Sequence, residues 1–384
     1  MHRDTKLMHY GRPSCSPRPA NPPVVRASTI LHDTVASYRK TIEERENDDS
    51  ILSYGRRGTT TAHELSNAIM DLEGGDACFL FPTGIAAIVG ALSAYVKSGD
   101  HLLIVDTIFP ATRNYCEKHL RKNGVSIDYI PWQTTDVTAW LKTNTKALLV
   151  ESPASQTFEI MDLPKLCENA HKQDIIVIAD NTYGSSWLYQ PLKLGCDVSV
   201  IAGTKYLSGH ADVMMGAVVA KGRACAAIRS LAHITGQTLG PDDAYACLRG
   251  IRTLSLRMER HGENSIALAN WFGERPEVTQ ILHPALPDHP GHEIWQRDSS
   301  GCNGLLTVVF NEGFEIEPFL DRLKLFSIGA SWGGFESLAL IITPQNDRQF
   351  SEFQPSNPMV RFHAGLENLD DLINDLDQAF LGSL

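Results

Sequence analysis

Short apolar runs alternate with longer amphipathic segments through the middle of the chain. Apolar runs of this kind, bounded by turn residues, predict buried strands, and the segments between them have the periodicity of helices. Strands are predicted at residues 77–81, 101–105, 147–150, 175–179 and 198–202. Helices are predicted over 63–73, which Gly74 and Gly75 terminate, and over 84–96. This alternation predicts an α/β fold with a mostly parallel central sheet, formed by residues 56–250.

The beginning of the chain has a different pattern. Prolines are dense between Pro13 and Pro23, and residues 41–50 are almost wholly polar. Residues 1–55 therefore cannot bury much apolar surface by themselves. We expect an extended arm that becomes ordered against a neighbouring subunit; the alternative is a disordered tail.

The pattern changes again after residue 250. A long helical pattern covers residues 254–272, strand-like runs follow at 305–310 and 338–342, and a helix is predicted over 369–380. These elements predict a smaller α+β domain over residues 251–384 that packs on the first domain.

Composition and charge exclude several classes of protein. The 384 residues are 43% hydrophobic and 21% charged, as in globular proteins. The formal net charge of −11 argues against nucleic acid or an anionic membrane as a partner, because both bind through excess positive charge. No run approaches the roughly 18 apolar residues of a membrane span. The start lacks the apolar run of a secretory signal, and the eight cysteines form no C-x-x-C pair, so a reducing cytoplasm is expected.

Common motifs for nucleotides and metals are absent from the sequence. It contains no G-x-G-x-x-G after a strand, no G-x-x-x-x-G-K-[ST] and no H-E-x-x-H. His283, His289 and His292 lie close together in a proline-rich loop, where histidines are expected to be solvated at the surface. No metal site is predicted, because no carboxylate-backed ligand spacing accompanies them.

Two polar residues follow predicted strands at the points where parallel strands end. Asp180 ends one run and Lys205 follows the next, so both are expected at the same edge of the sheet. Half-burial of Lys205 would favour a neutral, nucleophilic amine suited to a Schiff base; a solvated lysine is the alternative. Asp180 could be its ion-pair partner or could keep a pyridinium nitrogen protonated. The step from Thr83 to Gly84 into a helix suits a phosphate, although an ordinary helix start is the simpler interpretation.

Longer stretches around these residues match a known family. They are YGRRGT (54–59), ESPAS (151–155), ADNTYGS (179–185), GTKYLSGHADVMMG (203–216), GQTLGPDDAY (236–245), RGIRTLSLRMERH (249–261), SWGGFESL (331–338) and RFHAGLE (361–367). In these stretches the chain resembles the Cys/Met-metabolism family of pyridoxal-phosphate enzymes, and within it the bacterial cystathionine β-lyases. The resemblance implies pyridoxal 5′-phosphate as cofactor and the fold of aspartate aminotransferase (fold type I).

The resemblance also implies which residues bind the cofactor. Lys205 matches the lysine that is joined to the cofactor and moves protons, and Asp180 matches the carboxylate that faces the pyridine nitrogen. Gly84, Ile85 and Thr204 fall where the family holds the phosphate.

Other matching positions imply contacts with substrate and with a second subunit. Tyr54 and Arg56 match residues that reach the cofactor phosphate of the adjacent subunit, which implies a dimer at least, with a tetramer as the expected assembly. Arg361 matches the arginine that binds the substrate α-carboxylate, a role that its planar guanidinium suits.

The branch of the family is inferred from three residues. Where γ-acting relatives generally carry Asn and Leu, this chain has Ser155 and Trp332, and the pair Ser331–Trp332 resembles the β-lyases. The implied activity is cleavage of L-cystathionine, and of other cysteine S-conjugates, to a thiol such as homocysteine, pyruvate and ammonia. Such an enzyme serves transsulfuration and methionine biosynthesis.

One residue departs from the family pattern and leaves alternatives open. The aromatic ring that stacks on the cofactor usually belongs to Tyr, but Phe109 stands at that position and lacks the phenol. A γ-acting relative, or a lyase for other S-conjugates, therefore remains an alternative. A regulatory protein that binds the cofactor and acts through a partner is disfavoured by the complete set of Lys205, Asp180 and Arg361.

Overall fold

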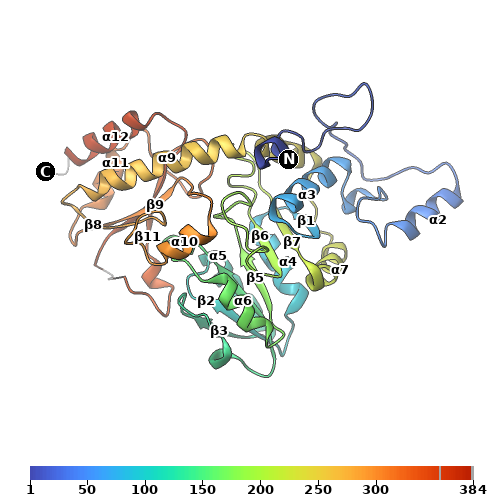
Figure 1. Cartoon of the computed structure of the whole chain (residues 1–384), viewed down its shortest axis with the longest axis horizontal. Coiled ribbons are helices and arrows are strands. Elements are labelled where there is room, and N and C mark those ends of the chain that lie inside the picture. The colour runs from blue at the N-terminus through green and yellow to red at the C-terminus, as the bar shows by residue number, and fades with distance from the viewer. Residues whose placement is uncertain (354–355, 382–384) are drawn as a thin grey trace.

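The structure is a computed structural model that describes residues 1–353 and 356–381. Its strands form two sheets, of which the larger has seven strands in the order β1-β7-β6-β5-β4-β2-β3 (Figure 1). These strands are β1 (Ala77–Phe81), β2 (His101–Val105), β3 (Ser126–Ile130), β4 (Thr145–Glu151), β5 (Ile176–Asp180), β6 (Val198–Ile201) and β7 (Gly216–Ala220). Neighbours pair in parallel except at β7, which is antiparallel to both β1 and β6. The mostly parallel α/β sheet is thus confirmed.

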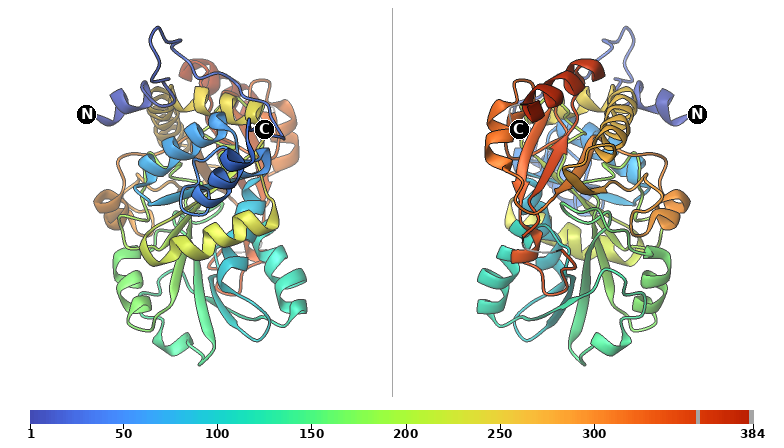
Figure 2. Two further views of the ribbon diagram at one scale, coloured as in Figure 1. Left: turned by 90° about the vertical axis from the view of Figure 1, so that its right-hand side faces the viewer. Right: turned by 90° about the vertical axis from the view of Figure 1, so that its left-hand side faces the viewer.

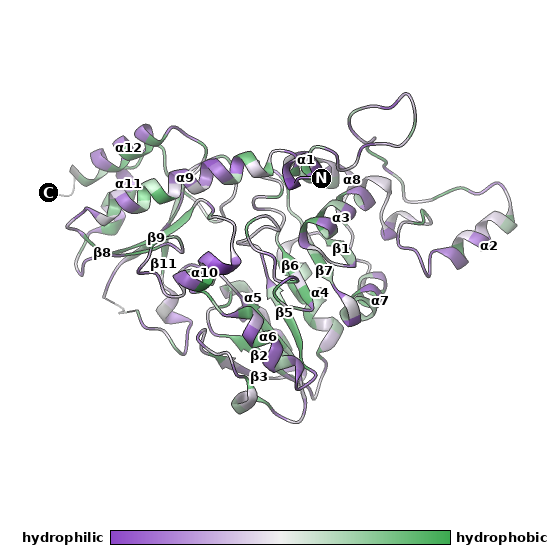
Figure 3. Cartoon of the chain, viewed as in Figure 1, coloured by the Kyte–Doolittle hydropathy of each residue, from purple (hydrophilic) through white to green (hydrophobic). Residues whose placement is uncertain are grey.

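The helices around this sheet explain why its strands are continuously apolar. Helix α4 packs along β6 and β7, α3 along β1, and α6 along β5, so strands such as β2 and β7 are buried over their whole length. Figure 3 shows these strands as hydrophobic, while the helices carry polar residues outward. The helices of this part are α3 (Thr60–Glu73), α4 (Gly84–Tyr95), α5 (Pro110–Tyr115), α6 (Leu163–His171), α7 (Cys225–Thr235) and α8 (Pro241–Ile251).

The second sheet has five strands in the order β10-β11-β12-β9-β8. They are β8 (Val278–Leu282), β9 (Leu305–Phe310), β10 (Ser327–Ile328), β11 (Leu338–Ile342) and β12 (Met359–His363). All pairs are antiparallel except β10 with β11. The accompanying helices are α9 (Leu254–Gly273), α10 (His292–Asp298), α11 (Ile316–Arg322) and α12 (Leu369–Leu381). Phenylalanines 272, 310, 319 and 362 fill the core between this sheet and its helices.

The N-terminal segment is only partly an extended arm. Helix α1 (Arg3–Leu7) packs on its own chain, where Leu7 is fully buried and the Arg3 guanidinium donates to the carbonyls of Ser186 and Trp187 at 2.7 and 2.9 Å. Helix α2 (Val35–Glu44), in contrast, has no buried residue and projects from the body of the molecule (Figures 1 and 2). Within the single chain this helix therefore makes no buried contact.

The apolar pattern of the sequence did not predict several of the strands. Strand β12 carries Arg361 at its centre, and a charged residue interrupts the apolar run that would have predicted it. Strands β3, β7, β8 and β10 were also not predicted, and α3 begins at Thr60 rather than residue 63. In the described ranges no helix has the length and apolarity needed to cross a membrane.

The expectation that the histidines of the proline-rich loop are solvated is wrong for two of them. His283 and His289 are buried, and their Nε2 atoms lie 3.1 Å from the Ser265 hydroxyl and 3.2 Å from the Thr157 carbonyl. Burial lowers the pKa of His283 to about 3, so it is a neutral hydrogen-bonding residue of the core. Within residues 1–353 and 356–381 no group of three metal-ligating side chains is gathered.

Candidate active site

A cavity of about 230 Å³ opens at the edge of the larger sheet, beyond the ends of β4, β5 and β6. Open α/β sheets commonly bind ligands at this edge. The residues around it come from both sheets and from the N-terminus of α4. They include most of the predicted site residues, namely Gly84, Ile85, Phe109, Ser155, Asp180, Lys205, Ser331, Trp332 and Arg361.

Lys205 lies in the first turn after β6 and is half-buried, as its sequence context predicted. Its Nζ donates a hydrogen bond to the Ser331 hydroxyl and lies 5.3 Å from the centre of the Trp332 ring. Burial, and secondly the positive charge of Arg361, lower the pKa of Lys205 to about 8. About a tenth of the amine is therefore neutral and nucleophilic at pH 7, far more than for an ordinary lysine.

Asp180 is the last residue of β5, and only 8% of its surface is exposed. Its Oδ1 accepts hydrogen bonds from the Thr182 amide at 3.0 Å and the Thr182 hydroxyl at 2.6 Å. The same hydroxyl accepts from the Ala202 amide at 3.0 Å, so Thr182 ties the turn after β5 to the end of β6. Burial raises the pKa of Asp180, while the Thr182 bonds and Lys205 oppose that rise.

Glu151 was not assigned a role from the sequence, although it lines the cavity. It ends β4 and pairs in register with Asp180 on β5. Its Oε2 accepts a hydrogen bond from the Phe109 amide at 2.7 Å. The surrounding protein and the charge of Asp180 raise the pKa of Glu151 well above its usual range. A carboxylate at a strand end is the signal that identified Asp180, and it applies equally to Glu151.

Arg361 reaches the cavity from β12 and is only 9% exposed. Its Nη2 donates to the Ser331 carbonyl at 2.9 Å, and burial lowers its pKa to about 10. Ser331 has a left-handed backbone with φ of 96°. Two residues later, at Gly333, the φ angle is 87°, and a Cβ atom there would lie 2.9 Å from the backbone of Lys205. Because glycine has no Cβ atom, the loop that contains Gly333 can pack directly against the backbone of Lys205.

The N-terminus of α4 forms another part of the wall. Thr83 caps this helix by accepting the Ala86 amide at 3.1 Å, which leaves the amides of Gly84 and Ile85 at the open first turn. A Cβ atom at Gly84 would lie 2.5 Å from the Cβ of Ala202, so only glycine allows this close approach.

Three predicted residues lie outside this cavity. The Thr204 hydroxyl bonds to both the carbonyl and the amide of Met215, at 3.1 and 3.0 Å. Tyr54 is 46% exposed, and the Arg56 guanidinium donates to the His233 carbonyl at 2.7 Å. Tyr54 and Arg56 instead line a separate hollow beneath the N-terminal segment.

The residues around the cavity fit pyridoxal phosphate. Lys205 supplies an amine of lowered pKa, Asp180 a buried carboxylate, Phe109 an exposed aromatic ring, and α4 a helix N-terminus for the phosphate. Arg361 adds a guanidinium for a carboxylate group of a substrate.

Comparison with known proteins shows which family the chain matches. The family model of Cys/Met metabolism PLP-dependent enzymes matches residues 4–381. Cystathionine beta-lyase MetC of Escherichia coli (strain K12) is 39% identical over 98% of both chains. The L-alanine/L-glutamate racemase of Wolbachia pipientis wMel is 34% identical, over 94% of this chain and 92% of its own. The crystal structure of cystathionine gamma-lyase from Lactobacillus plantarum, complexed with L-serine, superposes with a TM-score of 0.91 at 27% identity, over 100% of this chain and 99% of that one.

Proposed function

We propose that this chain, which belongs to the PLP-dependent enzymes of Cys/Met metabolism, is a carbon–sulfur β-lyase. The substrate proposed is L-cystathionine, with other cysteine S-conjugates as further substrates. The observation that carries the proposal is the convergence of Lys205, Asp180 and Arg361 on one cavity. The similarity to the Escherichia coli cystathionine β-lyase supports the choice of substrate.

The roles of the residues follow from their positions and charges. Arg361 binds the α-carboxylate of the amino acid, and its neighbour Ser331 keeps the guanidinium oriented. Lys205, with its lowered pKa, takes the proton from the substrate Cα atom at Nζ. Asp180 would hold a proton on the ring nitrogen of a bound cofactor. Pyridoxal phosphate bound here would act as the electron sink for the electron pair that remains on Cα after the proton is removed.

The net reaction is a hydrolysis. One cystathionine and one water give one homocysteine, one pyruvate and one ammonia, and the bond that breaks in the amino acid chain is Cβ–S. The protonated Lys205 amine can return its proton to the departing sulfur, so the same residue serves as base and then as acid.

A γ-acting enzyme is the second candidate. The structural similarity to the Lactobacillus plantarum cystathionine γ-lyase and the presence of Phe109 favour it. Elimination at Cγ requires a further proton to leave Cβ, whereas elimination at Cβ requires only the Cα proton. The β-reaction is therefore the simpler one for a cavity whose only lysine, within the described residues, is Lys205.

Product analysis of the purified protein tests the proposal. With L-cystathionine we expect pyruvate and homocysteine; 2-oxobutyrate and cysteine would instead identify the γ-reaction. Incubation with L-alanine followed by chiral analysis covers the reaction named for the Wolbachia relative. If the protein binds the cofactor but forms none of these products, the binding-protein alternative is favoured.

Lys205→Ala is the decisive variant. It should lose both pyruvate formation and the visible absorbance of a covalently bound cofactor. Lys172→Ala removes an exposed lysine that pairs with Glu168 at 2.8 Å on α6, and it should leave both signals unchanged. Retained activity in Lys205→Ala would refute the proposed mechanism.

We further propose that the enzyme works as a dimer at least. Tyr54 and Arg56 lie outside the cavity of their own chain, and α2 projects without a buried residue. A second subunit would give these residues a cofactor phosphate to contact. The eight cysteines of this chain form no disulfide, which supports a reducing cytoplasm as the compartment of the protein. Sedimentation of Arg56→Ala with and without cofactor would test the shared site.

A further inference from the structure

One wall of the cavity is a loop with an unfavourable backbone. Ser155, Gln156 and Phe158 line the cavity from the loop of residues 154–159, which follows β4. Gln156 and Phe158 have φ angles of 72° and 65°, in the left-handed region that favours glycine. Such residues persist only where the surrounding structure holds them, and they are common at functional sites.

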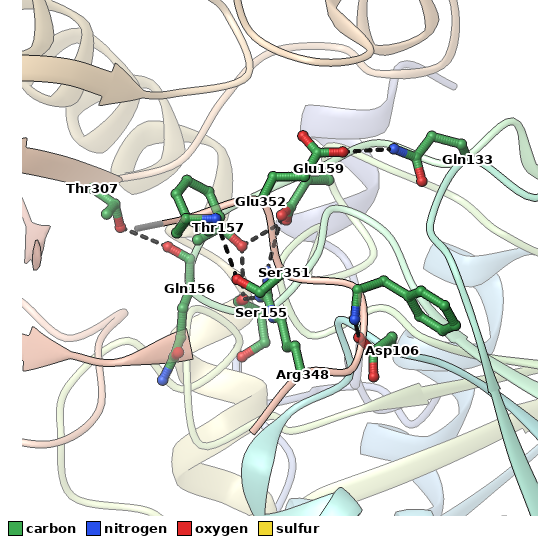
Figure 4. Close-up of polar contacts among 12 residues, drawn as sticks. Asp106, Gln133, Ser155, Gln156, Thr157, Glu159, Thr307, Arg348, Ser351 and Glu352 are labelled. Atoms are coloured by element: carbon green, nitrogen blue, oxygen red, sulfur yellow. Dashed lines mark hydrogen bonds and ion pairs between the residues drawn. The ribbon is translucent and has the colours of Figure 1, made fainter. Parts of the chain in front are cut away.

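The side chain that holds this loop comes from the connection between β11 and β12. Arg348 donates from Nη1 to Glu159 Oε1 at 2.9 Å and from Nη2 to the Ser155 carbonyl at 2.7 Å (Figure 4). The exposed fractions of the Arg348 and Glu159 side chains are 6% and 8%. One guanidinium therefore joins the two ends of the loop in a place that water scarcely reaches.

Further hydrogen bonds fix both the loop and the connection to the surrounding structure. Glu159 Oε2 accepts from the Thr157 hydroxyl at 2.6 Å, and the Thr307 hydroxyl donates to the Gln156 carbonyl at 2.6 Å. Two residues beyond Arg348, the Phe350 amide donates to Asp106 Oδ2 at 2.7 Å. The chain that next enters β12 and carries Arg361 is thereby anchored to the larger sheet.

We infer that Arg348 is a positioning residue that holds the Ser155–Gln156 wall at the place where the amino-acid substrate binds. It acts through the loop and does not itself line the cavity. The inference about substrate rests on the proposed function, since Ser155 and Arg361 line the same cavity. The inference about the loop rests only on the contacts of Arg348.

The planar fork of arginine is essential to this role. A guanidinium can donate along two directions at once, to a carboxylate and to a carbonyl, whereas a lysine ammonium at the same place acts as a single point charge. Arg348→Lys keeps the charge beside Glu159 and should lose the bond to Ser155. Glu159→Gln removes the charge of the partner but keeps an oxygen acceptor, so the bond to Ser155 should remain.

The test measures the loop and the catalysis separately. In hydrogen exchange of the purified full chain, Arg348→Ala and Arg348→Lys should exchange the peptide covering residues 154–160 about tenfold faster, the effect of one lost charge-assisted hydrogen bond. For pyruvate formation from cystathionine we expect KM to rise about tenfold with little change in kcat. Glu159→Gln, which keeps the bond to the Ser155 carbonyl, should show a smaller change than the two Arg348 variants in both measurements.

Arg275→Ala is the matched control, because it removes another guanidinium, paired with Asp377 at 2.9 Å, from the C-terminal part of the chain. Wild-type exchange of residues 154–160 in both Arg348 variants would overturn the inference. So would equally faster exchange along the whole chain in Arg348→Lys, since that would indicate general destabilisation. If the protein lacked lyase activity, the proposed function would fail while the exchange result would still decide the role of Arg348.

Discussion

Glu151 and Asp180 end adjacent parallel strands in register, so two carboxyl groups lie side by side at the floor of the cavity. Each accepts a backbone amide, Glu151 from Phe109 and Asp180 from Thr182. Two neighbouring carboxylates disfavour each other's charge, and the pKa of Glu151 is raised well above its usual range. Burial raises the pKa of both carboxyl groups, and that of Glu151 more strongly, so Glu151 is the one of the pair that is more readily protonated.

Replacing Glu151 tests whether its raised pKa keeps this carboxyl group protonated during catalysis. Glu151→Gln keeps an oxygen acceptor for the Phe109 amide and is neutral like the protonated acid, so we expect kcat within about threefold of wild type. Glu151→Ala removes the acceptor that fixes the Phe109 amide and should lower kcat about tenfold through the lost hydrogen bond. Steady-state assays of both variants make the comparison. Equal damage by both would contradict a protonated Glu151.

The interaction between Lys205 and Arg361 predicts how cofactor capture depends on pH. The neutral Lys205 amine is the reactive form, so the rate at which cofactor-free protein binds the aldehyde should rise with pH through about 8. The positive charge of Arg361 helps to lower that pKa. In Arg361→Leu the midpoint should move to higher pH, and KM for cystathionine should rise about a hundredfold through the lost carboxylate contact. Stopped-flow absorbance gives the midpoint; an unchanged midpoint would exclude this coupling.

The variant Phe109→Tyr tests the effect of the phenol that this position lacks. Phe109 is exposed to the cavity and its amide is fixed by Glu151, so tyrosine can occupy the same place. We expect the phenol to assist proton transfer and to raise kcat about tenfold, less than a full general acid–base effect because Lys205 already transfers the proton. Phe109→Leu, which removes the ring, should weaken cofactor binding instead. An unchanged rate and substrate preference in Phe109→Tyr would show that the phenol is dispensable.

Buried Glu73 predicts a pH-dependent stability. Its Oε1 accepts from Asn181, Ser186 and Ser199, and burial raises its pKa to about 7. An acid whose pKa is higher in the folded state binds more protons there, so its contribution is full below pH of about 4.5 and is lost as pH rises towards 7. The slope is at most about 1.4 kcal/mol per pH unit.

Glu73→Gln should therefore become more stable relative to wild type between pH 5 and pH 8. Urea unfolding at several pH values measures the difference, and Glu43→Gln, on the exposed side of α2, is the control. A constant difference across this range would mean that Glu73 does not titrate in it.

The sequence was sufficient for the parallel sheet and for the position of Lys205 and Asp180, because both depend on local order. Apolar runs of strand length alternate with helices, and parallel strands bring their carboxyl ends to one edge. The match to family motifs then identified Arg361, although the strand that carries it was not predicted, because a charged residue at its centre breaks the apolar pattern.

Only the tertiary structure decided which distant residues share the cavity. Burial and the charge of Asp180 on the next strand raise the pKa of Glu151, Arg348 reaches Ser155 across 193 positions of the chain, and His283 is neutral because it is buried. These properties arise from the neighbours and from the exclusion of water, which depend on how the two sheets pack. Residue type and spacing do not specify the neighbours of a side chain or its exclusion from water. The sequence therefore indicated what chemistry each side chain can perform, and the fold determined its charge and its partners.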